Sequence, residues 1–245
     1  MMENYPIEAL IRYIKTEIDT IALDYDGVIV NSVVESKKIV IKTAGQYGQL
    51  VKMTDFKDYS GMSWEEMFPK LGEKLNWTPE LISEISKEST LRALNKKFDV
   101  PDFLLVRIQE LKDVGLKIGV VTNRTMSSLK TSASLAGINL EEVFDFVATS
   151  DNLAHKKPSP GVWDDLYNSK QINFIGKVLF IGDSRIDFLT AQHKKFPVLF
   201  FGVNNQNEFI GCQLSEIKIF KETVAALNFI LTCKEKVKSP ELSII

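Results

Sequence analysis

The stretch that decides the fold is Ile21-Ala22-Leu23-Asp24-Tyr25-Asp26-Gly27-Val28-Ile29-Val30, in which two carboxylates interrupt an apolar run. Two ionised carboxylates one residue apart cannot both belong to a buried strand, because burying a charge is costly unless a cation neutralises it. The pair therefore marks the point where a strand ends in a loop. Gly27 allows the chain to turn there, or allows a ligand to approach the backbone. Taken alone, the run is equally compatible with an Asp-rich turn and with a reactive site.

The chain on the carboxyl side of residue 100 alternates between apolar strands and amphipathic helices. Strands are predicted at Lys117–Val121, Phe144–Ala148, Val178–Ile181 and Val198–Phe201, and helices at 101–114, 125–136, 160–169, 184–194 and 222–233. Strands that are apolar throughout are typical of a parallel sheet covered on both faces. The sequence therefore predicts an α/β fold with a doubly wound parallel sheet, preceded by an amphipathic helix over 5–18 that either packs on the core or mediates association.

The segment over 31–99 differs from the rest because it contains no convincing strand. Its predicted helices are Val33–Tyr47, Trp64–Leu75 and Pro79–Asn95. Ser63 with Glu66 is typical of a capping box, and Thr78 before Pro79 of an N-cap followed by a first-turn proline. We therefore predict a core domain formed by 1–30 and 100–245, with 31–99 inserted as a small helical cap domain. Met62 and Trp64 are candidates either for its inner, substrate-facing surface or for its own core.

The composition is that of an ordinary globular protein: 245 residues, 44% hydrophobic and 25% charged, with a net charge of −2. This charge provides no basic field for nucleic acid or anionic lipid, so neither partner is expected. The two cysteines, Cys212 and Cys233, form no CxxC pair and are expected to be ordinary thiols. No apolar run has the length of a membrane span, which favours a cytoplasmic protein. The sequence leaves open whether it is a monomer or a homodimer.

Three further polar clusters follow predicted strands. They are Thr122-Asn123-Arg124, Lys156-Lys157-Pro158-Ser159-Pro160 and Gly182-Asp183-Ser184-Arg185-Ile186-Asp187. In open α/β sheets, ligands bind outside the carboxyl ends of the strands, so these clusters are expected to meet Asp24 and Asp26 at one edge. Four carboxylates packed together would repel one another. A divalent cation such as Mg²⁺ would relieve that repulsion and, together with Lys157 and Thr122, would suit a phosphate.

Each cluster has a simpler explanation when taken alone. Lys157 could be a solvated loop lysine, Thr122 could cap the next helix, and Asp183 and Asp187 could stabilise a helix N-terminus. The appearance of all four clusters, in order and at strand ends, favours a shared site.

The set of four motifs resembles the haloacid dehalogenase-like superfamily of phosphotransferases. The DxDG motif is Asp24 to Gly27, the Ser/Thr motif is Thr122, the Lys motif is Lys157 with its Pro-x-Pro, and the GDxxxD motif is Gly182 to Asp187. The helical insertion resembles the cap of the phosphoglycolate phosphatase and β-phosphoglucomutase branch. The resemblance covers roughly 20–30 and 100–205 of the chain.

The resemblance implies a role for each motif residue. Asp24 would be the nucleophile and Asp26 the general acid and base. Mg²⁺ would be held by Asp24, Asp183 and the main-chain carbonyl of Asp26, with Asp187 as a ligand or as support for the other ligands. The phosphate would be held by Thr122 and Lys157, with Asn123 and Gly27 nearby.

Departures from the family narrow the reaction. Asp26 argues against a dehalogenase, which usually lacks the second aspartate. The loop Gly61-Met62-Ser63 resembles β-phosphoglucomutases, but Trp64 stands where an arginine normally binds a second phosphate, and an indole cannot replace a guanidinium there. The sequence thus predicts a Mg²⁺-dependent phosphatase acting on a small phosphate monoester. A phosphomutase and a non-catalytic binding protein of the same fold remain the alternatives.

Overall fold

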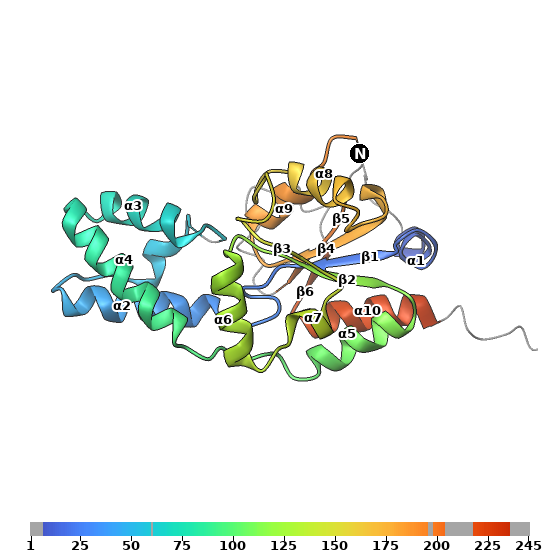
Figure 1. Cartoon of the computed structure of the whole chain (residues 1–245), viewed down its shortest axis with the longest axis horizontal. Helices are drawn as coiled ribbons and strands as arrows, with labels where there is room; N and C mark the ends of the chain where they lie inside the picture. Colours follow the sequence, from blue (N-terminus) through green and yellow to red (C-terminus); the bar gives the residue numbers. More distant parts are fainter. Residues whose placement is uncertain (1–6, 60, 196–197, 204–217, 236–245) are drawn as a thin grey trace, which may run out of the picture.

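The centre of the molecule is a six-stranded parallel sheet. The computed structural model describes residues 7–59, 61–195, 198–203 and 218–235. The strands are β1 (Thr20–Leu23), β2 (Lys117–Val121), β3 (Phe146–Ala148), β4 (Val178–Gly182), β5 (Leu199–Val203) and β6 (Lys218–Phe220). Their order is β3-β2-β1-β4-β5-β6, and each neighbouring pair is parallel (Figure 1). The carboxyl ends of β1 and its neighbours β2 and β4 therefore meet at one edge of the sheet.

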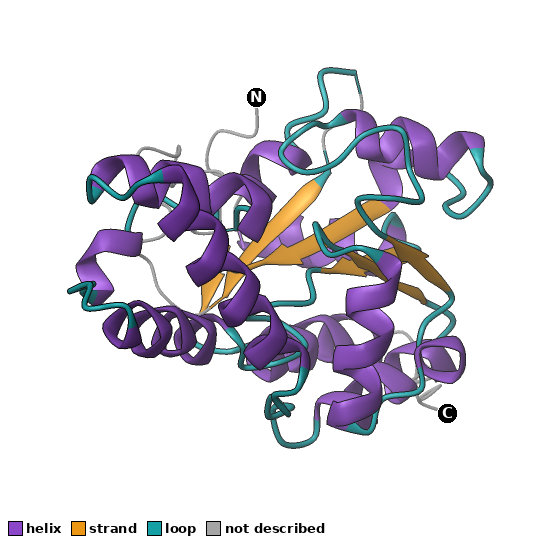
Figure 2. Ribbon diagram, turned by 60° about the vertical axis from the view of Figure 1, so that its left-hand side comes forward, coloured by secondary structure: helices purple, strands orange, loops and turns teal. Residues whose placement is uncertain are grey.

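Helices cover both faces of this sheet (Figures 1 and 2). They are α1 (Ile7–Thr16), α5 (Leu104–Asp113), α6 (Met126–Ala136), α7 (Leu140–Val143), α8 (Gly161–Asn168), α9 (Arg185–Ala191) and α10 (Thr223–Glu235). Successive side chains of a strand point to opposite faces. Accordingly, Ile21 and Leu23 of β1 join one hydrophobic cluster with α1, α5, α6 and α10, whereas Ala22 joins a second cluster with α8 and α9. The predicted doubly wound α/β fold is confirmed.

Some short elements were not predicted. Strand β6 lies at the edge of the sheet and has three half-buried residues, the first of which is Lys218. Such a short strand has too little apolar pattern to be predicted from the sequence. Helix α7 is a single turn, and the predicted strand 144–148 is shortened to β3 by this turn. Phe200 and Phe201 of β5 are buried in the core. Cys212 and the first two residues of the predicted helix 5–18 lie outside the described residues.

The N-terminal helix α1 packs on the core against α10. Ile14 is fully buried, and the Tyr13 hydroxyl donates a hydrogen bond to the main-chain carbonyl of Gly176 at 2.5 Å. Of the two roles left open by the sequence, packing on the core is the one that the structure shows. Among the described residues, no helix combines the length and apolarity needed to cross a bilayer.

The segment inserted between β1 and β2 is helical and has a hydrophobic cluster of its own. It contains α2 (Val33–Gln46), the short helix η1 (Met53–Phe56), α3 (Trp64–Lys74) and α4 (Pro79–Leu94). Phe56, Phe68, Leu71 and Ile85 are buried in this cluster. The division into a core domain and a cap domain stays a prediction, which the separate cluster supports.

The two predicted helix caps have different outcomes. The Thr78 side chain accepts a hydrogen bond from the main-chain N–H of Leu81 at 3.3 Å, and Pro79 occupies the first turn, as predicted. The predicted capping box at α3 is wrong, because the Ser63 side chain makes no capping hydrogen bond. Glu66 instead pairs with Lys156, at 2.5 Å between Nζ and Oε1, and so reaches across to the core.

Candidate active site

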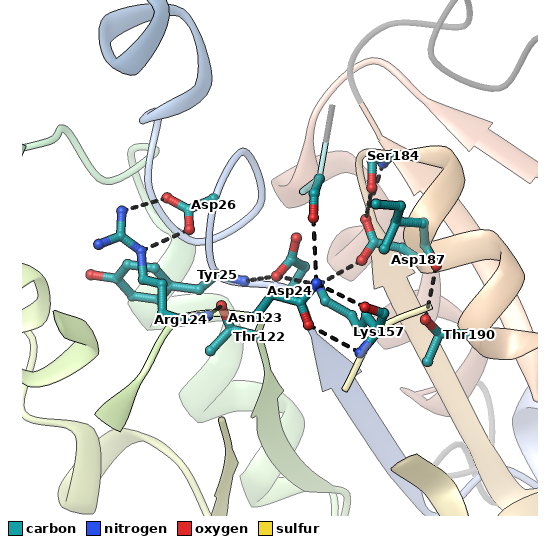
Figure 3. A network of polar contacts seen from close by, with 12 residues as sticks. Asp24, Tyr25, Asp26, Thr122, Asn123, Arg124, Lys157, Ser184, Asp187 and Thr190 are labelled. Atoms are coloured by element: carbon teal, nitrogen blue, oxygen red, sulfur yellow. Dashed lines mark hydrogen bonds and ion pairs between the residues drawn. The ribbon is translucent and has the colours of Figure 1, made fainter. Parts of the chain in front are cut away.

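The four polar clusters converge at the carboxyl ends of β1, β2 and β4. Asp24, Asp26, Thr122, Lys157 and Asp183 line one pocket of about 380 Å³. They come from the loops after β1, β2, β3 and β4, and Figure 3 shows the contacts among these clusters. Convergence follows from the topology, since parallel neighbours place their carboxyl ends at the same edge.

A buried ion-pair network forms the floor of this pocket. Lys157 Nζ lies 2.7 Å from Asp24 Oδ1 and 2.6 Å from Asp187 Oδ1 (Figure 3). The three side chains are buried, with exposed fractions of 3%, 7% and 0%. Burial alone would lower the pKa of Lys157, but the adjacent carboxylates of Asp187 and Asp24 raise it overall. Lys157 is therefore a fixed positive charge rather than a solvated loop lysine.

Asn123 holds the Lys157 loop in place. Its Nδ2 donates to the main-chain carbonyl of Lys157 and its Oδ1 accepts from the main-chain N–H of the same residue, both at 3.0 Å. Its Nδ2 also lies 3.4 Å from the carbonyl of Gly61 in the inserted segment. The predicted phosphate contact of Asn123 stays a prediction. Thr122 is buried beside it at the pocket, and its Oγ1 accepts from the main-chain N–H of Arg124 at 3.2 Å.

Asp26 faces a different partner from Asp24. Its two oxygens pair with Arg124 Nε and a terminal guanidinium nitrogen, each at 2.7 Å, and Oδ1 also accepts from the Ser32 hydroxyl. Burial raises the pKa of Asp26, but Arg124 and Ser32 outweigh it and hold the pKa below its ordinary value. Arg124 in turn lies over the Tyr25 ring, 5.4 Å from its centroid.

Arg124 and Ser32 were not among the predicted site residues. The available signal for Arg124 was its position directly after Thr122-Asn123 at a strand end, where a cation could reach the carboxylates of the neighbouring strand. Ser32 gave no comparable signal, because a serine before a helix is ordinarily an N-cap.

The carboxylates of Asp24, Asp183 and Asp187 form a group that fits a divalent metal ion. One oxygen of each lies within 4.8 Å of the others. Burial raises the pKa of Asp24 to about 7, a rise that Lys157 opposes and the neighbouring Asp187 and Asp26 reinforce. Burial and the same neighbours raise the pKa of Asp183 well above its ordinary value. A hard cation with oxygen ligands would offset this repulsion.

The members of this group differ in how far protein contacts already satisfy them. Within the described part of the chain, Asp183 has no hydrogen bond or ion pair, although it is buried. Asp187 is engaged on both oxygens, by Lys157 at 2.6 Å and by the Ser184 hydroxyl and main-chain N–H at 2.6 and 3.1 Å. The donor set therefore leaves Asp183 and Asp24 as the better available ligands, with Asp187 supporting Lys157.

Position 27 requires a glycine, because the Asp183 carboxylate lies close to the Gly27 backbone in the loop after β1. Its φ is +76°, and a Cβ there would lie 2.1 Å from Asp183 Oδ2. A side chain at this position would therefore displace the Asp183 carboxylate. Its predicted phosphate contact stays a prediction.

The opposite wall of the pocket comes from the inserted helices. Met62 and Trp64 both line it, and both also pack partly against the cluster of the inserted segment. The Trp64 ring meets Phe68 edge-on, with centroids 5.6 Å apart. The sequence left open whether these side chains face the substrate or belong to the core of the inserted segment. Each of them does both, since it lines the pocket and also packs against that core.

Comparison with known proteins gives the family. Residues 21–201 match the family model described as haloacid dehalogenase-like hydrolase. This chain belongs to the haloacid dehalogenase-like hydrolases. The predicted family and the prediction of a hydrolase are thereby confirmed. The matched segment of this hydrolase contains all four motifs, from Asp24 to Asp187.

Relatives and solved structures similar to this hydrolase carry several names. Pyrophosphatase PpaX of Bacillus cereus (strain AH820) is 26% identical over 184 residues, which cover 72% of this chain and 80% of the relative. A predicted phosphoglycolate phosphatase from Haemophilus somnus 129PT superposes with a TM-score of 0.70 at 16% identity, covering 87% and 98% of the two chains. A β-phosphoglucomutase from Clostridium difficile gives 0.64 at 16% identity, covering 91% and 100%. At such identities the structures show the shared fold.

Proposed function

We propose that this hydrolase is a Mg²⁺-dependent phosphatase that cleaves a small phosphate monoester through a phosphorylated Asp24. The observation that carries the proposal is the buried pair of Asp24 and Lys157 on the pocket floor, 2.7 Å apart. A carboxylate nucleophile held beside a fixed cation suits attack on a phosphate. One relative is named a pyrophosphatase, which is also an enzyme that acts at phosphorus, and this supports the proposal.

The residues divide the reaction into two transfers. A carboxylate oxygen of Asp24 attacks phosphorus and the ester P–O bond breaks. Asp26 gives a proton to the leaving oxygen, and it must first take that proton from solvent as the substrate binds, because Arg124 otherwise holds its pKa low. Asp26 then accepts a proton from water, whose oxygen attacks phosphorus and releases phosphate with Asp24 restored. Thr122 and Lys157 hold the phosphate oxygens in both transfers. Arg124 and Ser32 orient the Asp26 carboxylate.

Asp24, Asp183 and the main-chain carbonyl of Asp26 would hold Mg²⁺, with Asp187 as support. When bound, the ion would polarise the phosphoryl group and offset its negative charge. The Asp183 carboxylate supports this assignment, because it is buried and has no hydrogen bond or ion pair within the described part of the chain.

A phosphomutase is the second candidate, since β-phosphoglucomutases share the fold. Such an enzyme must also hold a second phosphate group. Among the residues that the structure describes, the basic ones that line the pocket are Lys37, Arg124 and Lys157, and the last two already pair with carboxylates. With Trp64 in the cap loop, one cation is left for a second phosphate, which favours the phosphatase.

Phosphate release from phenyl phosphate tests the proposal. Asp24→Asn should lower kcat/KM at least about 1,000-fold, because an amide cannot act as the nucleophile. Asp19→Asn, at the opposite end of β1, is the matched control and should stay within about twofold of the unaltered protein. Chelation should abolish activity and Mg²⁺ should restore it.

Full activity of Asp24→Asn, or of the metal-free protein, would contradict the proposed mechanism. Isomerisation of a sugar phosphate that needs a bisphosphate activator and releases little phosphate would instead identify a mutase. Pyrophosphate belongs in the same panel, because its cleavage would use the same floor residues.

A further inference from the structure

The pocket is larger than a phosphate group requires. Its volume of about 380 Å³ falls in the range of roughly 300–1,000 Å³ that is usual for pockets enclosing drug-sized ligands. Asp24, Thr122 and Lys157 lie at its floor, where the phosphate would bind. The remaining space lies against the inserted helices and is available to the organic part of an ester.

The wall facing this space is apolar and partly aromatic. Val40, Tyr59, Met62, Trp64 and Met67 line it. The Tyr59 hydroxyl donates to the main-chain carbonyl of Lys70 at 3.3 Å, and the edge contact with Phe68 supports the Trp64 ring. Burying an apolar group against this wall is favourable, and an aromatic ring packs well on aromatic and thioether side chains.

The ammonium group of Lys37 on this wall has no protein partner among the described residues. Lys37 of α2 is half-buried and lines the pocket, and it forms no hydrogen bond or ion pair with any residue in the described part of the chain. The next residue, Lys38, is exposed and pairs with Glu35 at 2.7 Å. Glu65 also lines the pocket but is exposed, so its charge is more strongly hydrated than that of Lys37. A partly desolvated ammonium beside apolar groups favours an anionic partner.

We propose that the substrate is a phosphate monoester whose organic part is a ring-sized apolar group with an anionic substituent, such as a carboxylate or second acid group. The ring packs on the wall of Val40, Tyr59, Met62, Trp64 and Met67, and Lys37 pairs with the anion. This inference rests on the proposed phosphatase function and names its substrate class. It makes Lys37 a specificity-determining residue.

The anion is tested with 4-carboxyphenyl phosphate against phenyl phosphate, which share a ring. The unaltered protein should prefer the carboxylated ester by about tenfold or more in kcat/KM, mainly through KM. Lys37→Met should bring this ratio close to unity, and Lys37→Arg should retain most of it. Lys38→Met is the matched control on the same helix and should keep the full ratio.

The ring is tested with 2-phenylethyl phosphate against ethyl phosphate, which are both primary alkyl esters. The larger ester should be preferred by about tenfold or more, because its ring is removed from water on binding. Met62→Ala should reduce this preference. Met53→Ala is the matched control, since Met53 is 42% exposed and does not line the pocket.

The outcomes separate the two proposals. If phosphate is released from these esters with both ratios near unity, or if Lys37→Met leaves the first ratio unchanged, the substrate class is wrong while the phosphatase stands. If none of the esters releases phosphate with Mg²⁺ present, the proposed function fails, and this inference fails with it.

Discussion

The two acids of Asp24-Tyr25-Asp26 occupy different environments although one residue separates them. Asp24 faces Lys157 and the other carboxylates, and burial raises its pKa to about 7. Asp26 faces Arg124 and Ser32, which hold its pKa below the ordinary value against the effect of burial. Tyr25 between them is fully buried and its hydroxyl bonds Ser132 at 3.1 Å. These two directions are opposite to those that a nucleophile and a general acid need. The proposed roles therefore require a cation beside Asp24, which would lower its pKa, and a weaker hold of Arg124 on Asp26 in the substrate complex.

Gly27→Ala is predicted to damage the site as well as the backbone. The new Cβ would lie 2.1 Å from Asp183 Oδ2, so that carboxylate must move. Gly48→Ala is the control, because Gly48 has a similar φ of +72° and no atom within 4 Å of an added Cβ. Both changes should cost roughly 1–2 kcal/mol of stability through the left-handed backbone.

The difference between the two glycine variants isolates the clash. Gly27→Ala should also lose phosphatase activity and weaken Mg²⁺ binding, measured by kinetics and by isothermal titration calorimetry, while Gly48→Ala keeps both. Unimpaired Mg²⁺ binding by Gly27→Ala would show that Asp183 is not a ligand.

At the scale of elements, helix ends in the inserted segment are stabilised in unequal ways. Helix α4 starts with a side-chain cap from Thr78 and a proline in its first turn. Helix α3 starts at Ser63 without a side-chain cap, and its Glu66 serves an ion pair with Lys156 instead. A local sequence motif therefore describes a cap only when no distant residue competes for its side chains.

Thr78→Ala is predicted to lower the free energy of unfolding by about 1 kcal/mol, because the main-chain N–H of Leu81 loses its acceptor. Ser63→Ala should cost clearly less, since no capping bond is lost there. Urea unfolding followed by circular dichroism measures both. Equal losses for the two variants would contradict the assignment of the caps.

At the scale of the whole molecule, the inserted helices contact the core near the phosphate-binding floor. Asn123 bonds both Gly61 and the Lys157 loop, and Glu66 pairs with Lys156 beside Lys157. The main-chain N–H of Asn31 donates to the carbonyl of Asp99 at 2.8 Å, which ties together the two ends of the insertion. These contacts join the inserted segment to the loops that carry the floor residues.

The buried acid cluster should make the stability of the whole protein depend on Mg²⁺. An ion that binds the native state alone stabilises it by about 2.7 kcal/mol at 100 times its Kd. The Tm should therefore rise with MgCl₂ but not with NaCl of equal ionic strength. Asp183→Asn should abolish the rise, and without metal it should melt above the unaltered protein, because a buried, repelling carboxylate is removed. A Mg²⁺-dependent rise that persists in Asp183→Asn would contradict the predicted ligand set.

The sequence by itself determined the features that depend on neighbours along the chain. The apolar strands, the carboxylates that end β1 and β4, and the cap at Thr78 could all be predicted, since burial and backbone geometry act over a few residues. The parallel topology then implied that the motif residues would meet.

Only the tertiary structure decided which of these residues are paired with one another. Asp26 and Arg124 are 98 positions apart, and Lys156 and Glu66 are 90 apart, so no local pattern describes either pair. The short edge strand β6 depends on a neighbouring strand for its hydrogen bonds. The uncommitted charge of Lys37 appears only when every described neighbour has been placed. Electrostatic partners are selected by distance in space, and the fold, rather than the order of residues, sets that distance.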